Sequence, residues 1–288
     1  MNTDFLCEQH LQKLNPQLHR LFKESVFSLQ NLLMKYKNIF PTYTDHTALH
    51  SIEVIDFCNA LIGDNIDKLN ADELYILIMS CYLHDSGMGI TEADYKLFSE
   101  SIDFGDYFEK HKNPETPDII RDFHHEYSGR YIKKYSSFFD IPSDEHCFAI
   151  IQVSRGHRKT NLFDETEYPS EYMLPNGNTV CLPYLAALIR LADELDISAD
   201  RNLAFMYDIE KINNDFSRME FMKHKAIKKL DITPTGFIMH VDSSDQKVFD
   251  GVVELSTKLD STLQQCRDVV RQRTPYRIEQ STITVETI

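Results

Sequence analysis

The stretch ADELYILIMSCYLHDSG, residues 71–87, is apolar along most of its length and closes with an adjacent histidine and aspartate. A helix that is apolar all round is buried among other helices, and Asn70 or Asp72 could cap its start. Aspartate is rarely buried unless it is paired or binds a metal. The stretch therefore predicts a helical core with polar chemistry, at His84 and Asp85, where its central helix ends.

Helical periodicity continues on both sides of this stretch. Apolar residues recur every three or four positions from Leu18 to Leu33, and again from Thr47 to a stop at Gly63. Residues 124–135, 143–154 and 183–197 follow the same pattern. Residues 158–179 contain Pro, Gly and Asn with weak periodicity, which predicts a long loop of the kind that covers sites. We expect residues 1–205 to form one mainly α domain, a helical bundle.

The pattern changes after about residue 205. Residues 224–232 and 236–242 alternate apolar and polar side chains around Pro234-Thr235-Gly236, which predicts a β-hairpin. Residues 246–273 predict one long amphipathic helix, and residues 276–287 predict a third strand. We expect residues 206–288 to form a small α+β module of ββαβ order, with an exposed strand edge that mediates homodimerisation or binds a partner protein.

Charge is distributed unevenly along the 288 residues, whose net charge is −15. Residues 206–288 hold 12 basic and 13 acidic residues, so the remaining 18 basic and 32 acidic residues give residues 1–205 a net charge of −14. Binding to long nucleic acid is driven by neutralisation of phosphates and needs a basic face. The acidity therefore argues against nucleic acid as a partner and favours a small substrate.

The sequence lacks three features that would indicate a membrane, secreted or disulfide-bonded protein. No apolar run approaches the roughly 20 residues that cross a bilayer. The N-terminal MNTDFLCEQH lacks the basic and apolar parts of a secretory signal. The six cysteines are scattered and form no CxxC pair. We expect reduced, mostly buried thiols in a cytoplasmic protein that does not bind membranes.

Six of the twelve histidines lie in four short motifs, which an acidic motif follows. In order, the five motifs are DHTALH (45–50), LHDSG (83–87), HHEYS (124–128), SRGHRK (154–159) and RLADELD (190–196). Taken singly, each histidine is more simply a hydrogen-bonded core residue, Asp85 a helix terminator and Asp193 a partner for Arg190. The ordered series in one chain instead favours a shared site for divalent metals such as Mn, Fe, Co, Ni, Zn or Mg, which imidazole and carboxylate ligands suit.

The ordered series resembles the HD superfamily of metal-dependent phosphohydrolases. The resemblance rests on His50 at the start of a helix, on LHDSG at 83–87 and on IRLADELD at 189–196, and it covers about residues 40–200. It implies an HD-type helical bundle in which His50, His84, Asp85 and Asp193 are the four ligands of one metal.

The additional histidines are similar to those of multinuclear HD branches, which include cyclic-nucleotide phosphodiesterases and HD-GYP proteins. This similarity implies a second metal held by His157 and by His124 or His125, with Asp85 bridging the two ions. His124 is favoured, because HHEYS fits the His-x-x-x-small pattern of that branch when counted from it. Met88 stands where HD-GYP proteins have a lysine, and the GYP tripeptide is absent, which argues against activity on cyclic di-GMP. HHEYSG, SRGH and LADELDIS are most similar to HD modules from bacterial nucleotide-signalling and defence contexts.

The expected reaction is hydrolysis of a small phosphorylated substrate, a nucleotide or cyclic nucleotide, by metal-activated water. Asp85 and His46 are the expected catalytic residues, with His46 acting as a further ligand, an orienting residue or a general acid. Arg155, Arg158 and Lys159 would bind the substrate phosphates, unless they form a solvated basic surface. The alternatives are a catalytically silent module that senses a nucleotide or metal, and an HD-type nuclease acting on single-stranded nucleic acid.

Overall fold

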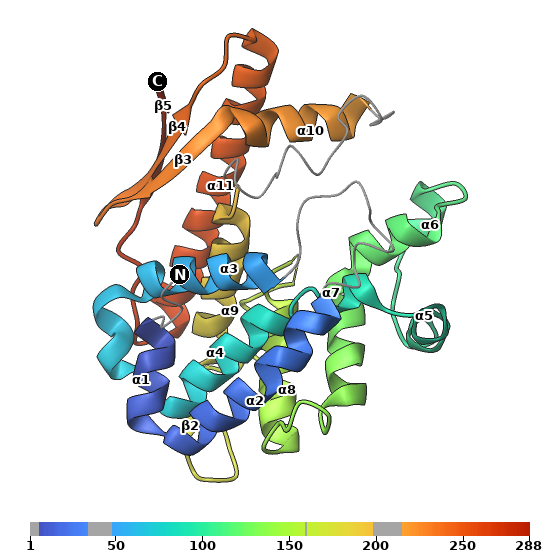
Figure 1. Cartoon of the computed structure of the whole chain (residues 1–288), viewed down its shortest axis with the longest axis vertical. Coiled ribbons are helices and arrows are strands. Elements are labelled where there is room, and N and C mark those ends of the chain that lie inside the picture. Colours follow the sequence, from blue (N-terminus) through green and yellow to red (C-terminus); the bar gives the residue numbers. More distant parts are fainter. Residues whose placement is uncertain (1–5, 34–47, 159, 198–214) are drawn as a thin grey trace.

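The computed structural model describes residues 6–33, 48–158, 160–197 and 215–288. Most of this chain is helical, and a small sheet lies at one end of the molecule, near the C-terminus (Figure 1). The prediction of a mainly α fold with a C-terminal α+β module is confirmed. The helical part contains α1 (Leu6–Leu14), α2 (Pro16–Leu33), α3 (Ala48–Ile62), η2 (Gly63–Lys68), α4 (Ala71–Leu83), η3 (Ser86–Gly89), α5 (Glu92–Ser99), α6 (Tyr107–Lys110), α7 (Thr116–Tyr135), α8 (Asp144–Arg155) and α9 (Leu182–Leu195). None of the described helices is both long enough and apolar enough to span a lipid bilayer.

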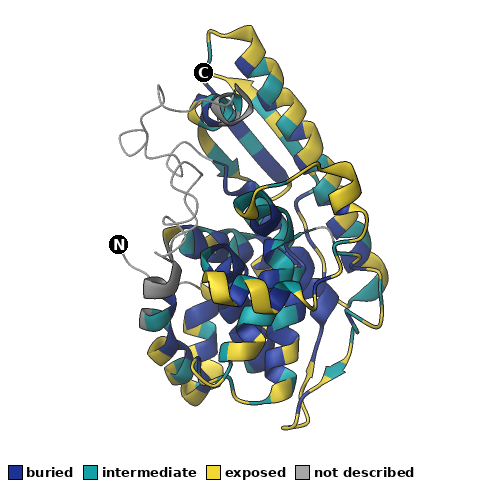
Figure 2. Ribbon diagram, turned by 90° about the vertical axis from the view of Figure 1, so that its right-hand side faces the viewer, coloured by how far each residue is buried: buried dark blue, intermediate teal, exposed yellow. Residues whose placement is uncertain are grey.

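Helix α4 is the centre of the bundle, as its sequence predicts. It packs against α1, α2, α3, α8 and α9, and the buried residues gather in this helical core (Figure 2). Asn70 begins the helix with a capping box: its side chain accepts hydrogen bonds from the backbone amides of Asp72 and Glu73, and Glu73 accepts from the amide of Asn70. Asp72 is therefore not the cap. Its buried carboxylate instead accepts a hydrogen bond of 2.9 Å from His146.

The C-terminal part contains α10 (Asp215–Ala226), β3 (Ile227–Ile232), β4 (Gly236–Val241), α11 (Gln246–Arg273) and β5 (Thr282–Thr287). The three strands form a sheet in the order β3-β4-β5, with β4 antiparallel to β3 and parallel to β5. Helix α11 contacts α9 as well as β5, so one long helix joins the sheet to the bundle (Figure 1).

Two strand boundaries differ from the prediction. The hairpin begins at Ile227 rather than at residue 224, because α10 continues to Ala226. The third strand begins at Thr282 rather than at residue 276. The guanidinium of Arg267 on α11 donates hydrogen bonds of 2.7 Å and 2.5 Å to the carbonyl oxygens of Ile278 and Gln280, which holds the intervening stretch along the helix instead.

The predicted loop over residues 158–179 exists, but its tip does not cover the His84–Asp85 end of α4. It contains a two-residue pairing of β1 (Tyr172–Met173) with β2 (Thr179–Val180). The side-chain amides of Asn176 and Asn178 donate hydrogen bonds of 3.0 Å and 2.7 Å to Asp72, in the first turn of α4. Asp72 and His84 are 12 positions apart, or about 18 Å along the helix, so the tip of the loop is bound at the opposite end of α4.

Candidate metal centre

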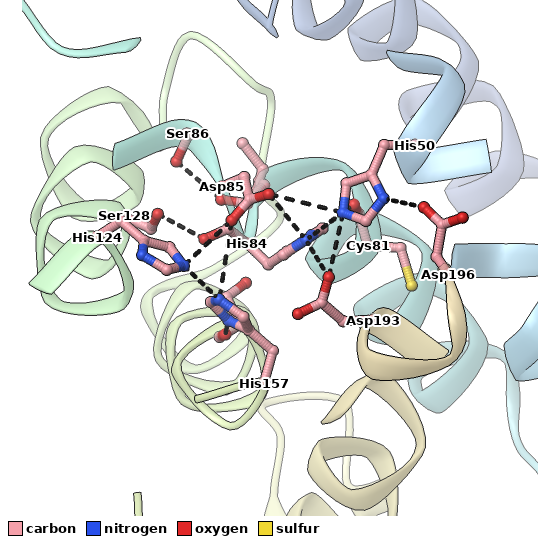
Figure 3. Close-up of polar contacts among 12 residues, drawn as sticks. His50, Cys81, His84, Asp85, Ser86, His124, Ser128, His157, Asp193 and Asp196 are labelled. Atoms are coloured by element: carbon pink, nitrogen blue, oxygen red, sulfur yellow. Dashed lines mark hydrogen bonds and ion pairs between the residues drawn. The ribbon is translucent and has the colours of Figure 1, made fainter. Parts of the chain in front are cut away.

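Five elements of the bundle bring histidine and aspartate side chains to one buried point (Figure 3). His50 lies in the first turn of α3, and His84 and Asp85 follow the last residue of α4. His124 lies in α7, His157 just after α8, and Asp193 in the last turn of α9. Residues that are up to 143 positions apart in the chain therefore meet where these helices converge.

A first group consists of His50, His84, Asp85 and Asp193. The Nε2 atom of His50 lies 3.2 Å from Asp193 Oδ1 and 3.6 Å from Asp85 Oδ2. The Nε2 atom of His84 lies 3.3 Å from Asp85 Oδ2 and 3.7 Å from Asp193 Oδ1. Ligand atoms around one ion in tetrahedral or octahedral geometry are about 3.0–3.5 Å apart. His50, His84 and Asp85 thus offer ligand atoms that all lie within 4.8 Å of one another, and Asp193 lies beside both histidines.

A second group uses the other oxygen of the same carboxylate. The Oδ1 atom of Asp85 lies 3.3 Å from Nε2 of His124 and 3.7 Å from Nε2 of His157. His124, His157 and Asp85 offer ligand atoms that all lie within 4.8 Å of one another. Figure 3 shows the two groups on either side of Asp85, so the two oxygens of this carboxylate face different pairs of histidines.

Each of the four histidines is anchored through its Nδ1 atom, which leaves Nε2 facing the shared space. The acceptors are the carboxylate of Asp196 for His50, at 2.5 Å, and backbone carbonyl oxygens for the others: Cys81 for His84, at 2.9 Å, Arg121 for His124, at 2.5 Å, and Ser154 for His157. An anchored Nδ1–H determines the tautomer and makes Nε2 the free ligand atom, as in histidines that bind metals.

The paired Nε2 atoms favour a positive charge between them. The Nε2 atoms of His50 and His84 are 3.2 Å apart, and those of His124 and His157 are 2.8 Å apart. When both Nδ1 atoms carry protons, two Nε2 lone pairs would face each other at these distances unless a proton or a metal ion lies between them. The donor set therefore fits divalent metal ions.

The electrostatics of the first group also favour positive charge. Burial would raise the pKa of Asp193, but hydrogen bonds from His50 and His84 outweigh it and hold this pKa well below its ordinary value. Burial would lower the pKa of His84, but the charges of Asp85 and Asp193 raise it to about 10. In the second group, burial and the neighbouring histidines hold the pKa of His157 well below its ordinary value. The carboxylates of Asp85 and Asp193 thus attract positive charge, which a bound metal ion would provide.

The turn after Asp85 is built for close contact with α7. A Cβ atom added to Gly87 would lie 2.4 Å from the carbonyl oxygen of His124 and 2.6 Å from the amide nitrogen of Ser128. The amide of Gly87 donates a hydrogen bond of 2.8 Å to the Ser128 hydroxyl, which itself donates one of 2.6 Å to the carbonyl of His84. Only glycine lets η3 approach α7 closely enough for Asp85 to reach His124.

Arg190 positions the second group instead of pairing with Asp193. Its guanidinium donates hydrogen bonds of 2.7 Å to the carbonyl of Gly156 and 2.8 Å to that of Thr160. These carbonyls flank His157, so Arg190 ties the end of α8 to α9. Asp193 remains turned toward His50 and His84.

Other residues predicted for the site are not all brought together. The structure places His124 in the second group and His125 outside both groups, with its Nε2 atom 3.9 Å from Glu126. The Nε and Nη2 atoms of Arg155 donate to Glu126 at 2.8 Å and 2.6 Å, so a phosphate would have to replace this partner. Arg158 is partly exposed next to His157. His46 and Lys159 lie outside the described residues.

Asp196 is a site residue for which the sequence predicts no role. Its carboxylate, 2% exposed, accepts the hydrogen bond from His50. The available signal was the second aspartate of ADELD, three residues after Asp193. Asp193 is the most exposed carboxylate of the cluster, at 16% against 4% for Asp85, so the centre is more open to solvent on its side.

The chain was also compared with known proteins. The family model HD-CE matches residues 40–273, which include every member of both groups and continue through α11. No curated protein matches the chain, and no solved structure does. The match covers far more than half of the 288 residues. The chain therefore belongs to the HD-CE family, a family of HD-domain proteins.

Proposed function

We propose that this protein is a metal-dependent phosphohydrolase that acts on a small phosphorylated substrate, a nucleotide or cyclic nucleotide. The observation that carries the proposal is the Asp85 carboxylate, which presents one oxygen to His50 and His84 and the other to His124 and His157. Asp193 would complete the ligands of the first ion. Such paired ions lower the pKa of a bound water and neutralise charge on phosphoryl oxygens during hydrolysis.

The protein's own residues would hold and shield this centre. The Nδ1 anchors keep the four imidazoles from rotating, and burial of His50, His84 and His157 excludes bulk water behind the cluster. The substrate would approach beside Asp193, whose side chain is partly exposed. Two carboxylates at that point repel a phosphate unless metal ions neutralise them, so substrate binding should require metal.

A leaving group needs a proton, and the cluster histidines are poorly placed to supply it. Each has its Nδ1–H engaged with an oxygen and its Nε2 directed at the cluster. The general acid would therefore come from outside the two groups. His46, four residues before His50, is the candidate that the sequence offers.

The test combines metal analysis with a substrate panel. Protein purified without chelators should carry more than one equivalent of metal per chain. The panel contains bis-p-nitrophenyl phosphate, nucleoside monophosphates, cyclic nucleotides and a single-stranded oligonucleotide, each with Mn, Ni or Mg. We expect hydrolysis of a small substrate, and Asp85→Ala should abolish it while the circular-dichroism spectrum is retained.

His146→Gln is the matched control, because His146 is also buried and bonded to an aspartate but lies outside both groups. It should retain hydrolysis. Metal-loaded wild-type protein that binds nucleotides but hydrolyses nothing in the panel would contradict the proposal and favour the silent sensor. Activity of Asp85→Ala within a few-fold of wild type would place the chemistry elsewhere.

A further inference from the structure

The two edges of the three-stranded sheet differ in how they are protected. At the β3 edge the register with β4 shifts between Ile227 and Lys229, and the exposed Lys228 and Lys229 add charge. Such irregularities and lysines are the usual protection of an edge strand against pairing with another chain. Strand β5 pairs with β4 over six consecutive residues without a shift.

The sequence of β5, Thr-Ile-Thr-Val-Glu-Thr, has high strand propensity and contains neither proline nor glycine. Its one charged residue is Glu286. Figure 1 shows β5 along the outer side of the sheet, next to the C-terminus. The edge at β5 therefore lacks the protective features that β3 has.

The backbone groups on the outer side of β5 follow from its pairing with β4. The amide of Ile288 donates a hydrogen bond of 3.0 Å to the carbonyl of Val241, toward β4. Because successive amides of a strand alternate in direction, the amides of Ile283, Val285 and Thr287 point away from β4. Among the described residues, no backbone hydrogen bond is made to these outward groups.

We propose that β5 is a homodimer interface, in which it pairs antiparallel with β5 of a second copy about a twofold axis at Thr284. This register places Ile283 opposite Val285 of the second copy, and the reverse. Both residues have outward backbone groups, so each such pair can exchange two hydrogen bonds. The result is one continuous six-stranded sheet with α11 of both copies on the same face.

The residue pattern of β5 fits a second copy of itself. Ile283 and Val285 lie on the face that packs against the core, and both remain only partly buried. Pairs of β-branched residues across neighbouring strands stabilise a sheet, and the proposed register forms two of them. On the opposite face Glu286 meets Thr282 of the second copy, so no like charges oppose each other. Ile288, 66% exposed, lies at the same edge.

Cysteine cross-linking tests the register. All six native cysteines are buried, so an introduced surface thiol reacts selectively. Thr284→Cys places two thiols across the axis in a non-hydrogen-bonded pair, with Cα atoms about 4.5 Å apart, which suits a disulfide. Thr282→Cys, on the same face, is the matched control. Its two thiols would be displaced by four residues, or about 14 Å along the strand. Mild oxidation should cross-link the first variant and not the second.

Sedimentation over a range of concentrations tests the dimer itself. Wild type should shift from the 33.6 kDa chain toward twice this mass as concentration rises. Thr284→Asp opposes like charges across the axis and should remain monomeric, whereas Thr284→Val should dimerise as wild type does. A wild-type chain that stays monomeric at every concentration, a Thr284→Asp protein that still dimerises, or equal cross-linking at positions 282 and 284 would each overturn the proposal.

Discussion

Asp196 lies just beyond α9, yet it determines which nitrogen of His50 faces the metal centre. The 2.5 Å hydrogen bond occupies Nδ1 of the imidazole, and both side chains are at most 2% exposed. A carboxylate in this position fixes the ring orientation and makes Nε2 a better ligand. Asp196 therefore acts on the metal through His50, as a positioning residue.

We predict that Asp196→Ala weakens metal binding by about 10- to 100-fold, the usual effect of removing such an outer partner. Asp196→Asn should lose less, because its amide oxygen still accepts the Nδ1 proton. Titration of Mn in competition with a chelator measures both affinities. Equal affinities in Asp196→Ala and wild type would show that the hydrogen bond does not orient His50.

The sequence predicted which residues lie at the centre better than it predicted the hydrogen bonds between them. The histidine and aspartate motifs, through their resemblance to HD proteins, pointed to His50, His84 and His157, which the structure places in the two groups around Asp85. The sequence assigned no role to Asp196, because the contact with His50 joins residues 146 positions apart. The alternative reading of Asp193 as a partner for Arg190 is wrong, because this guanidinium donates to backbone carbonyls. Such long-range pairings depend on helix packing, which periodicity does not specify.

At the scale of elements, the centre depends on how closely η3 approaches α7. A side chain at Gly87 would collide with backbone atoms of α7, which cannot move aside as a flexible side chain can. We predict that Gly87→Ala lowers the free energy of unfolding by about 1–3 kcal/mol. It should also reduce occupancy of the second metal group more than of the first, because Asp85 moves away from His124.

Gly129→Ala, in α7, is the matched control. Its added Cβ would lie 3.2 Å from a methyl group of Ile151, and alanine favours a helix over glycine. Urea unfolding and metal analysis of both variants measure the difference. Two metal equivalents and wild-type stability in Gly87→Ala would contradict the role given to this contact.

A buried carboxylate, that of Asp94, helps to hold helix α5 to α7. Asp94, 3% exposed, accepts hydrogen bonds from Lys134 at 2.6 Å and from Thr91 at 2.8 Å. Burial would raise its pKa, but these bonds hold the pKa below its ordinary value. A depressed pKa contributes stability at pH values above the unfolded-state pKa of about 3.9, and this contribution disappears as pH falls through the folded-state value.

We predict that Asp94→Asn lowers the free energy of unfolding at neutral pH by about 1–3 kcal/mol. The difference from wild type should shrink as pH falls below about 4. Asp106→Asn is the control, because Asp106 pairs with Lys110 at 2.7 Å but is 59% exposed and should matter little. Urea unfolding from pH 3 to 7 gives the comparison. A difference that is constant over this range would show that the carboxylate is not linked to stability.

The elements themselves were largely predictable, and their ends were not. Helix α11 has the predicted bounds, because its amphipathic pattern begins and ends with clear signals. The third strand starts six residues later than predicted, since Arg267 draws the preceding carbonyls to α11. The alternation of apolar and polar side chains cannot reveal this effect, because the arginine that binds the carbonyls lies on another element.

At the scale of the whole molecule, four arginines of the described residues bind other parts of the protein and do not form a basic surface. Arg155 pairs with Glu126 at 2.6 Å, and Arg190 and Arg267 donate to backbone carbonyls. Arg271 is 74% exposed but pairs with Asp268 at 2.7 Å. These four arginines are thus engaged within the protein, and residues 1–205 have a net charge of −14.

We predict that metal-loaded protein binds nucleotides but does not bind single-stranded oligonucleotides in the micromolar range. A net charge of −14 over residues 1–205 repels a polymer beyond the phosphates that the metal centre itself can neutralise. Fluorescence anisotropy at low salt is the sensitive measurement, because screening then weakens attraction least. Tight binding that falls steeply with added salt would mean that counterions are released from several phosphates. It would require a basic track outside the described residues, and the nuclease alternative would then explain the metal centre better than a small substrate does.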